Sequence, residues 1–230
     1  MTDTAALNQK YFNQIASDYD RRYEKSLGQV EKEIKNARDF IGMRQGGRAL
    51  DYACGTGLLS RSMGEDASQC IGIDISDSMV EAYNAKAKLE GAFPDKREAH
   101  LGNLIDPSDP SPAAFSDPKF SNFDLAGVGA GFHHFDDPAL AARRLAERLR
   151  PGGVLFIMDF MPREIDEGMR SHGVTHHGFS EGQMRSVFEG AGVGGEFRFK
   201  ELAEPFVMHN ANGDGKHKSL RMFFARGSKL

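Results

Sequence analysis

A glycine-rich turn between two apolar segments constrains the fold of this chain more than any other feature. Residues 49–57 are Ala-Leu-Asp-Tyr-Ala-Cys-Gly-Thr-Gly, an apolar strand-like segment that runs into small residues. Small residues let the backbone turn sharply and approach a ligand closely. Seventeen residues after Gly57, Asp74 ends a second apolar segment. A carboxylate at such a strand end can accept hydrogen bonds from both hydroxyls of a ribose.

The sequence pattern of the turn differs from the dinucleotide-binding motif, which is G-x-G-x-x-G. Here Ala53, Gly55 and Gly57 alternate in the order D-x-A-x-G-x-G. Together with Asp74, this pattern resembles the class I S-adenosylmethionine-dependent methyltransferases, and it disfavours an NAD-dependent oxidoreductase. The resemblance covers about residues 8–226. It implies S-adenosylmethionine as the cofactor.

Length and composition are typical of one soluble domain. The chain has 230 residues, of which 40% are hydrophobic and 27% charged, so residues 1–230 are expected to form a single domain. A net charge of −4 gives no electrostatic footprint for nucleic acid or an anionic membrane. Two cysteines without CxxC spacing indicate neither a disulfide framework nor a zinc site. The expected partner is a small-molecule substrate, and a protein partner or homo-oligomer stays open.

The alternation of apolar strands with helical patterns predicts an α/β fold. Strands are expected at 49–52, 70–74, 99–101, 123–128 and 154–160, with helices between them and a helical first forty residues. Two further strands, at 196–202 and 220–225, suggest an antiparallel pair. The predicted architecture is Rossmann-like: a doubly wound, mostly parallel seven-stranded sheet with a terminal antiparallel strand pair. Four prolines in residues 107–119 argue against a regular element there.

The resemblance implies a set of cofactor-binding positions. The loop after the first strand would approach the methionine part of the cofactor, and Asp74 would bind the ribose. Ile75 and Met79 would flank the adenine, although Met79 could equally be a core residue. The positions that match the family are Asp51, Ala53, Gly55, Thr56, Gly57, Asp74, Ile75, Met79, Asn103, Leu104 and Gly129.

The N-terminal residues resemble the opening of the ubiquinone-biosynthesis-like branch of the family. In that branch, tyrosines at the positions of Tyr11 and Tyr19 close over the cofactor, which makes residues 1–45 a candidate helical lid. The two tyrosines are eight residues apart, about two helical turns, so one helix face can present both. The alternative is an amphipathic helix that packs on the sheet edge.

Histidines are the candidate catalytic and substrate-binding residues. His134 and His177 are the predicted catalytic pair, and His133, His176 and Phe179 are predicted to contact substrate. Residues 161–178 would fold over the substrate. The alternatives are packing or capping histidines and a solvated loop. His133-His134 with Asp136-Asp137 is the cluster nearest to a metal site, and no metal is predicted.

The implied reaction is an in-line displacement in which a nucleophile attacks a methyl group and a neutral thioether leaves. Such a step needs alignment and desolvation more than a metal, and it needs a base only if the acceptor arrives protonated. A protein methyltransferase, a partner-binding regulatory subunit and a non-catalytic cofactor-binding module remain alternatives, since fold does not prove catalysis.

The last three residues, Ser228-Lys229-Leu230, spell a peroxisomal import signal. Such a signal requires an exposed end, so residues 227–230 are expected to form a free tail. If the tripeptide is a coincidence, the expected location is the cytoplasm.

Overall fold

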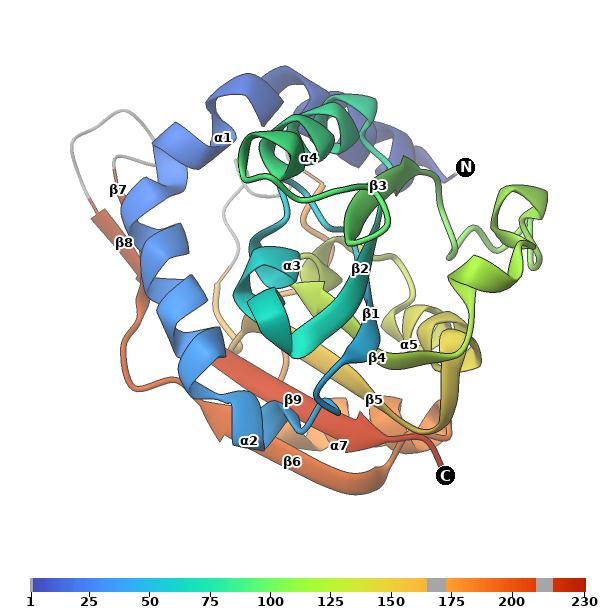
Figure 1. The fold of residues 1–230 in the computed structure, drawn as a ribbon. Helices are drawn as coiled ribbons and strands as arrows, with labels where there is room; N and C mark the ends of the chain where they lie inside the picture. The colour runs from blue at the N-terminus through green and yellow to red at the C-terminus, as the bar shows by residue number, and fades with distance from the viewer. Residues whose placement is uncertain (1, 165–172, 210–216) are drawn as a thin grey trace.

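A seven-stranded sheet organises the computed structural model, which describes residues 2–164, 173–209 and 217–230. The strand order is β3-β2-β1-β4-β5-β9-β6, in which β9 pairs antiparallel with β5 and β6 and the other neighbouring strands pair parallel (Figure 1). This architecture confirms the predicted fold class. The strands are β1 (Gly47–Tyr52), β2 (Ala67–Asp74), β3 (Arg97–Leu101), β4 (Phe123–Gly129), β5 (Leu149–Phe160), β6 (Gly195–Glu201) and β9 (Met222–Ser228).

Helices cover both faces of the sheet, as the alternation of apolar segments along the chain predicts. Leu50 and Leu155 belong to the core under α5 and α7, whereas their neighbours Ala49 and Phe156 belong to the core under α1 and α3. Successive strand residues therefore supply two separate cores. The helices are α1 (Asp3–Asn36), α2 (Arg38–Ile41), α3 (Leu58–Met63), α4 (Asp77–Leu89), α5 (Pro138–Arg148) and α7 (Glu181–Gly190).

Side-chain caps set where two of these helices begin. The Ser76 hydroxyl accepts a hydrogen bond from the Met79 N–H at the start of α4, at 3.1 Å. Ser180 begins α7 with a capping box that it shares with Gln183. Each cap satisfies a backbone N–H that has no partner inside its helix.

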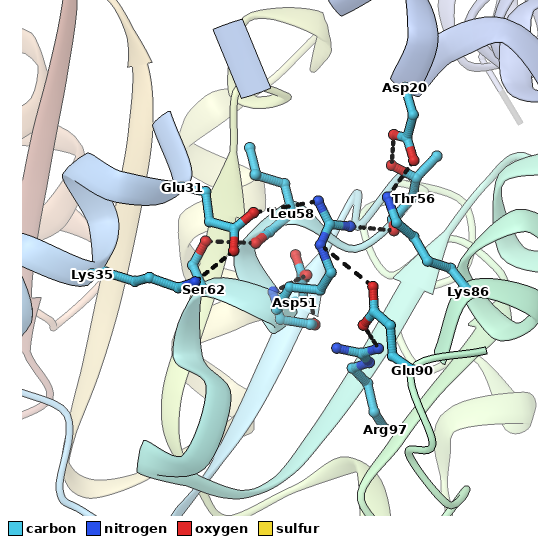
Figure 2. Close-up of polar contacts among 12 residues, drawn as sticks. Asp20, Glu31, Lys35, Asp51, Thr56, Leu58, Ser62, Lys86, Glu90 and Arg97 are labelled. Atoms are coloured by element: carbon cyan, nitrogen blue, oxygen red, sulfur yellow. Dashed lines mark hydrogen bonds and ion pairs between the residues drawn. The ribbon is translucent and has the colours of Figure 1, made fainter. Parts of the chain in front are cut away.

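The first helix, α1, is 34 residues long and lies across α3 and α4 (Figure 1). Three of its own side chains, Ile15, Val30 and Ile34, are buried. From α3, Arg61 pairs with Glu31 of α1 and with Glu90 just after α4 (Figure 2). The helix predicted for the first forty residues is confirmed, and it joins the helices that surround the glycine loop.

Two features of the C-terminal third differ from prediction. A separate hairpin, β7 (Phe206–His209) with β8 (His217–Leu220), packs beside α1. Its four-residue strands are too short to show a clear period in the sequence. Residues 210–216 lie outside the described residues. The other difference is that β5 begins at Leu149 and not at residue 154, and its pairing with β4 is irregular between Leu149 and Val154. Between β3 and β4, the proline-rich segment carries two short 3-10 turns, Ala113–Phe115 and Pro118–Phe120.

The expectation of a free tail at residues 227–230 is wrong for most of its length. Gly227 and Ser228 are the end of β9 and pair with Leu155 and Val154 of β5. The Lys229 ammonium donates to the carbonyl oxygens of Ala146 and Leu149, both at 2.8 Å. Leu230 is 89% exposed. Strand pairing with β5 and β6, which local sequence does not reveal, holds this segment. In the described parts of the chain, no helix is long and apolar enough to cross a membrane.

Candidate cofactor and active site

A cavity of about 370 Å³ opens where β1, β2 and β4 end. The strand order reverses between β1 and β4, and in open α/β sheets ligands bind in the crevice at such a switch point. The first half of α1 covers this crevice and supplies Ala5, Asn8 and Phe12 to its wall. The predicted site residues that line the cavity are Tyr19, Ala53, Gly55, Thr56, Asp74, Ile75, Met79, Asn103, Gly129 and His134.

The glycine loop and Asp74 form the floor of the cavity. The Gly55 N–H donates to one Asp74 carboxylate oxygen at 2.8 Å, and the Ser76 N–H donates to the other at 2.9 Å. Burial raises the pKa of Asp74, and these backbone bonds oppose the rise. The loop turns through Ala53 and Gly55, whose φ angles are 54° and 51°. A side chain at Gly55 would meet no protein atom within 4 Å, so the backbone borders open space at this position.

The loop is also tied to the covering helix. The Thr56 hydroxyl donates to Asp20 of α1 at 2.6 Å, and Asp20 pairs with Lys86 of α4 (Figure 2). Further along α1, Gln9 donates to the Ile75 carbonyl at 3.0 Å. Asn13 accepts from the Ser76 hydroxyl at 2.5 Å. Sequence reasoning missed these three polar residues, since each faces its partner only after α1 has packed on the sheet.

Four predicted cofactor residues lie outside the cavity lining. Asp51 is buried behind the loop, where it accepts from the Ser60 N–H and hydroxyl at 3.0 and 2.7 Å. Burial raises its pKa to about 7. Gly57 packs against the Tyr83 ring, which would lie 2.8 Å from a side-chain Cβ there. Leu104 is core, and Tyr11 packs edge-on against Phe12. The matched motif therefore includes residues that shape the loop as well as residues that face the ligand.

Asn103 lines the cavity with its amide in a defined orientation. Its Oδ1 accepts from the Tyr52 hydroxyl and from the Ile105 N–H, each at 2.9 Å. The amide oxygen is thus used within the protein, and the Nδ2 group is the part that remains for a ligand. An exocyclic amine, which is itself an N–H donor, is therefore poorly matched to Asn103. A ring nitrogen is the better match for an N–H donor.

Of the five predicted catalytic and substrate residues, His134 alone lines the cavity. His133 is buried, and its Nδ1 lies 2.9 Å from the Asp159 carboxylate. His176 bonds through Nε2 to the Phe135 carbonyl at 2.9 Å, and Phe179 is core. His177 is exposed and bonds to the Arg163 carbonyl. The predictions for these four residues are not supported by their positions.

One backbone arrangement explains the placement of these side chains. The turn η4 (Phe132–His134) presents the His133 carbonyl to the N–H groups of Thr175 and His176, at 3.0 and 3.1 Å. The segment after residue 173 therefore docks behind the turn, not over the cavity. Residues 165–172 of the predicted covering insertion lie outside the described residues.

The cavity wall is mostly apolar and also contains acidic residues. Leu27, Val30, Met158, Phe206 and Met222 line it, and so do Asp106, Asp136 and Asp137. No lysine or arginine occurs among the described lining residues. Nor does the described part of the chain hold three His, Cys, Asp or Glu side chains grouped as metal ligands.

Comparison with known proteins places this arrangement in a family. A family model described as a methyltransferase domain matches residues 26–193. An uncharacterized methyltransferase of Schizosaccharomyces pombe is 29% identical over 175 residues, which cover 71% of this chain and 58% of that protein. A demethylmenaquinone methyltransferase of Staphylococcus aureus is 28% identical over 156 residues, covering 65% of this chain and 58% of the relative. The chain thus spans somewhat more than half the length of these curated relatives.

Solved structures show the same fold at lower identity. A magnesium protoporphyrin IX methyltransferase from Synechocystis PCC 6803 with bound SAH superposes with a TM-score of 0.70 at 16% identity, covering 99% of this chain and 100% of that one. The strand order and the family match agree with one another. The chain therefore belongs to the methyltransferase domain family, which confirms its resemblance to the class I enzymes.

Proposed function

We propose that this protein transfers a methyl group from S-adenosylmethionine to a small-molecule acceptor. The observation that carries the proposal is the position of Asp74, whose carboxylate borders a cavity at the β1–β4 switch point. Family membership supports the same chemistry.

The residues of the cavity fit this cofactor. Asp74 can accept from the two ribose hydroxyls, and Ile75 and Met79 offer apolar contacts to an adenine ring. The Asn103 amide N–H can donate to a ring nitrogen. Open space next to Gly55 leaves room for the amino-acid part of the molecule beside the loop. Carboxylates in the wall also suit a cationic sulfonium, because opposite charges attract strongly away from bulk water.

The chain's own residues would contribute alignment and exclusion of water. S-adenosylmethionine, when bound, supplies an electrophilic methyl group on sulfur. The α1 roof and the apolar wall formed by Met158, Phe206 and Met222 exclude solvent from the acceptor side. Desolvating the nucleophile and holding it in line lower the barrier without a metal.

Enclosure favours a small acceptor over a protein side chain. The cavity lies under α1, and its volume of about 370 Å³ is typical of small-molecule sites. Curated relatives named for demethylmenaquinone support an acceptor of this kind. A protein partner is a second proposal, supported by a solved complex between a Haloferax volcanii putative methyltransferase and the Trm112 activator.

The test is a binding titration with a matched pair of variants. Calorimetry is expected to show binding of S-adenosylhomocysteine and no binding of NAD. Asp74→Ala removes the acceptor of two hydrogen bonds and should weaken binding at least about tenfold, since each such bond to a charged group contributes roughly 1.5–3 kcal/mol. Asp95→Asn, at an exposed acid, is the control. If the wild-type protein released or absorbed heat on titration with NAD but not with S-adenosylhomocysteine, the proposal would be overturned.

Peroxisomal location is a separate proposal that the tripeptide Ser228-Lys229-Leu230 supports. Because Lys229 is bonded in the folded chain, an import receptor would have to release it. An N-terminal fluorescent fusion should co-localise with a peroxisomal marker and become diffuse when Leu230 is deleted. Diffuse fluorescence from the intact fusion would place the protein in the cytoplasm.

A further inference from the structure

Asn8 is a buried polar residue on the covering helix. Only 7% of its surface is exposed, although asparagine is a weak helix former and usually lies at the surface. Its amide bonds at two points to one residue 126 positions away. Nδ2 donates to the His134 carbonyl at 3.2 Å, and Oδ1 lies 3.1 Å from His134 Nδ1.

These contacts settle the tautomer of His134. A carbonyl oxygen can only accept, so the Asn8 Nδ2 must face it and Oδ1 must face the ring. The Gly173 carbonyl also lies 3.0 Å from Nδ1. Two acceptors meet the same ring nitrogen, so Nδ1 carries the proton and Nε2 keeps its lone pair. No described residue bonds to Nε2, and His134 lines the cavity.

The close approach of Gly173 to the Asn8 side chain is a second observation about this contact. A Cβ at residue 173 would lie 1.9 Å from the Asn8 Oδ1, and the φ angle there is +78°. Glycine is the residue that adopts this backbone without strain and lets Asn8 reach the ring.

We propose that Asn8 is a positioning residue that, with the Gly173 carbonyl, holds His134 as an Nδ1-protonated imidazole, so that Nε2 accepts a hydrogen bond from an uncharged hydroxyl or aryl amine on the methyl acceptor. This inference rests on the proposed methyl transfer. Burial, with His133 alongside, lowers the pKa of His134 to about 3, so the ring stays neutral and its lone pair stays available. The acidic groups in the wall, which would repel an anion, agree with an uncharged acceptor.

The step balances without a further reactant. A lone pair on the acceptor oxygen or nitrogen forms the bond to the methyl carbon, and the carbon–sulfur bond breaks with its electrons staying on sulfur. The sulfonium charge passes to the methylated acceptor atom. When that atom is oxygen, it then releases its proton to Nε2, and water removes the proton afterwards. A methylated hydroxyl is an oxonium, which is acidic enough for a weakly basic histidine to accept its proton, whereas a methylated aryl amine is a weaker acid and passes its proton to water.

The first test measures the tautomer directly. In protein with ¹⁵N-labelled histidine and saturated with S-adenosylhomocysteine, long-range ¹⁵N–¹H correlation should show His134 protonated at Nδ1 and bare at Nε2. Asn8→Leu should mix the tautomers, whereas Asn8→Asp keeps the acceptor oxygen and should retain the wild-type pattern. An Nε2-protonated ring in the wild type, or no change in Asn8→Leu, would overturn the assignment.

The second test measures which acceptor groups bind. With the cofactor site saturated by S-adenosylhomocysteine, para-pentylphenol and para-pentylaniline should bind about tenfold more tightly than para-pentylanisole, which lacks the donor. Para-pentylbenzoate should bind more weakly than the phenol. The phenol-to-anisole difference should vanish in His134→Phe. Equal wild-type affinities, or no phenol binding, would overturn the inference. Loss of S-adenosylhomocysteine binding itself would instead count against the proposed function.

Discussion

Two acids near the glycine loop have different roles because they lie at different points along their strands: Asp51 is inside β1, whereas Asp74 is the last residue of β2. Asp74 ends β2 and borders the cavity, where two backbone N–H groups orient its carboxylate. Asp51, inside β1, does not line the cavity and accepts twice from Ser60. We infer that Asp51 shapes the loop by fixing α3 against β1, while Asp74 meets the ligand.

The raised pKa of Asp51 makes a prediction about stability against pH. Its folded-state pKa of about 7 lies above the ordinary value of 3.8, so ionisation disfavours folding. The resulting penalty is absent below about pH 4, grows as the pH rises and levels off above about pH 7. Asp51→Asn keeps an oxygen for Ser60 and never ionises. It should be more stable than wild type by up to about 4 kcal/mol at about pH 8, at roughly 1.4 kcal/mol per pKa unit.

Urea unfolding of both proteins across this pH range is the measurement. Asp95→Asn, which replaces an exposed acid, should follow the wild-type curve. A constant gap between Asp51→Asn and wild type would show that Asp51 does not titrate in this window.

At the scale of elements, α1 covers the crevice at the ends of the strands and so makes it a cavity. Gln9, Asn13 and Asp20 hold it to the loops after β2 and β1. Asp20 is the most telling of the three, since it bonds to Thr56 in the glycine loop and to Lys86 on α4. A helix held at the rim in this way can act as a gate for the ligand.

Asp20→Ala is therefore predicted to loosen the cover. S-adenosylhomocysteine should dissociate several-fold faster, and amides of residues 3–23 should exchange hydrogen faster in the bound state. Asp18→Ala is the matched control, because Asp18 pairs with Arg21 and Arg22 of its own helix. Equal dissociation rates for the two variants would make α1 a fixed scaffold and not a gate.

At the scale of the whole molecule, the last strand of the chain inserts between two strands that precede it in sequence. β9 enters between β5 and β6, so residues near the C-terminus lie at the interior of the sheet (Figure 1). The Lys229 ammonium then reaches carbonyl oxygens at the end of α5. A cation at a helix C-terminus satisfies carbonyls that have no partner within the helix, and it interacts favourably with the helix dipole.

Lys229→Met should remove this contact while keeping a side chain of similar length. The free energy of unfolding is expected to fall by about 1–2 kcal/mol, the magnitude of a charged hydrogen bond at a partly exposed site. Lys200→Met, at an exposed position on β6, should leave it nearly unchanged. Denaturant titration measures both, and equal stabilities would indicate a free tail in solution.

Tertiary contacts decided which histidine reached the cavity. His133, His134, His176 and His177 look alike in the sequence, as two adjacent pairs near aromatic residues. Their roles separate only when the segment after residue 173 bonds to the His133 carbonyl and the Asp159 carboxylate meets the His133 ring. The role of Asn8 was not predicted for the same reason, because its partner His134 lies 126 residues away in the sequence.

The sequence by itself determined the parallel sheet, the glycine loop and the placement of Asp74. These depend on local rules: apolar runs form buried strands, small residues permit tight turns, and the carboxyl ends of parallel strands share one edge. Only the tertiary structure decided the cover by α1, the tautomer of His134 and the docking of Lys229. Each depends on hydrogen bonds between segments far apart in the chain, and such bonds form only after the core has brought the segments together.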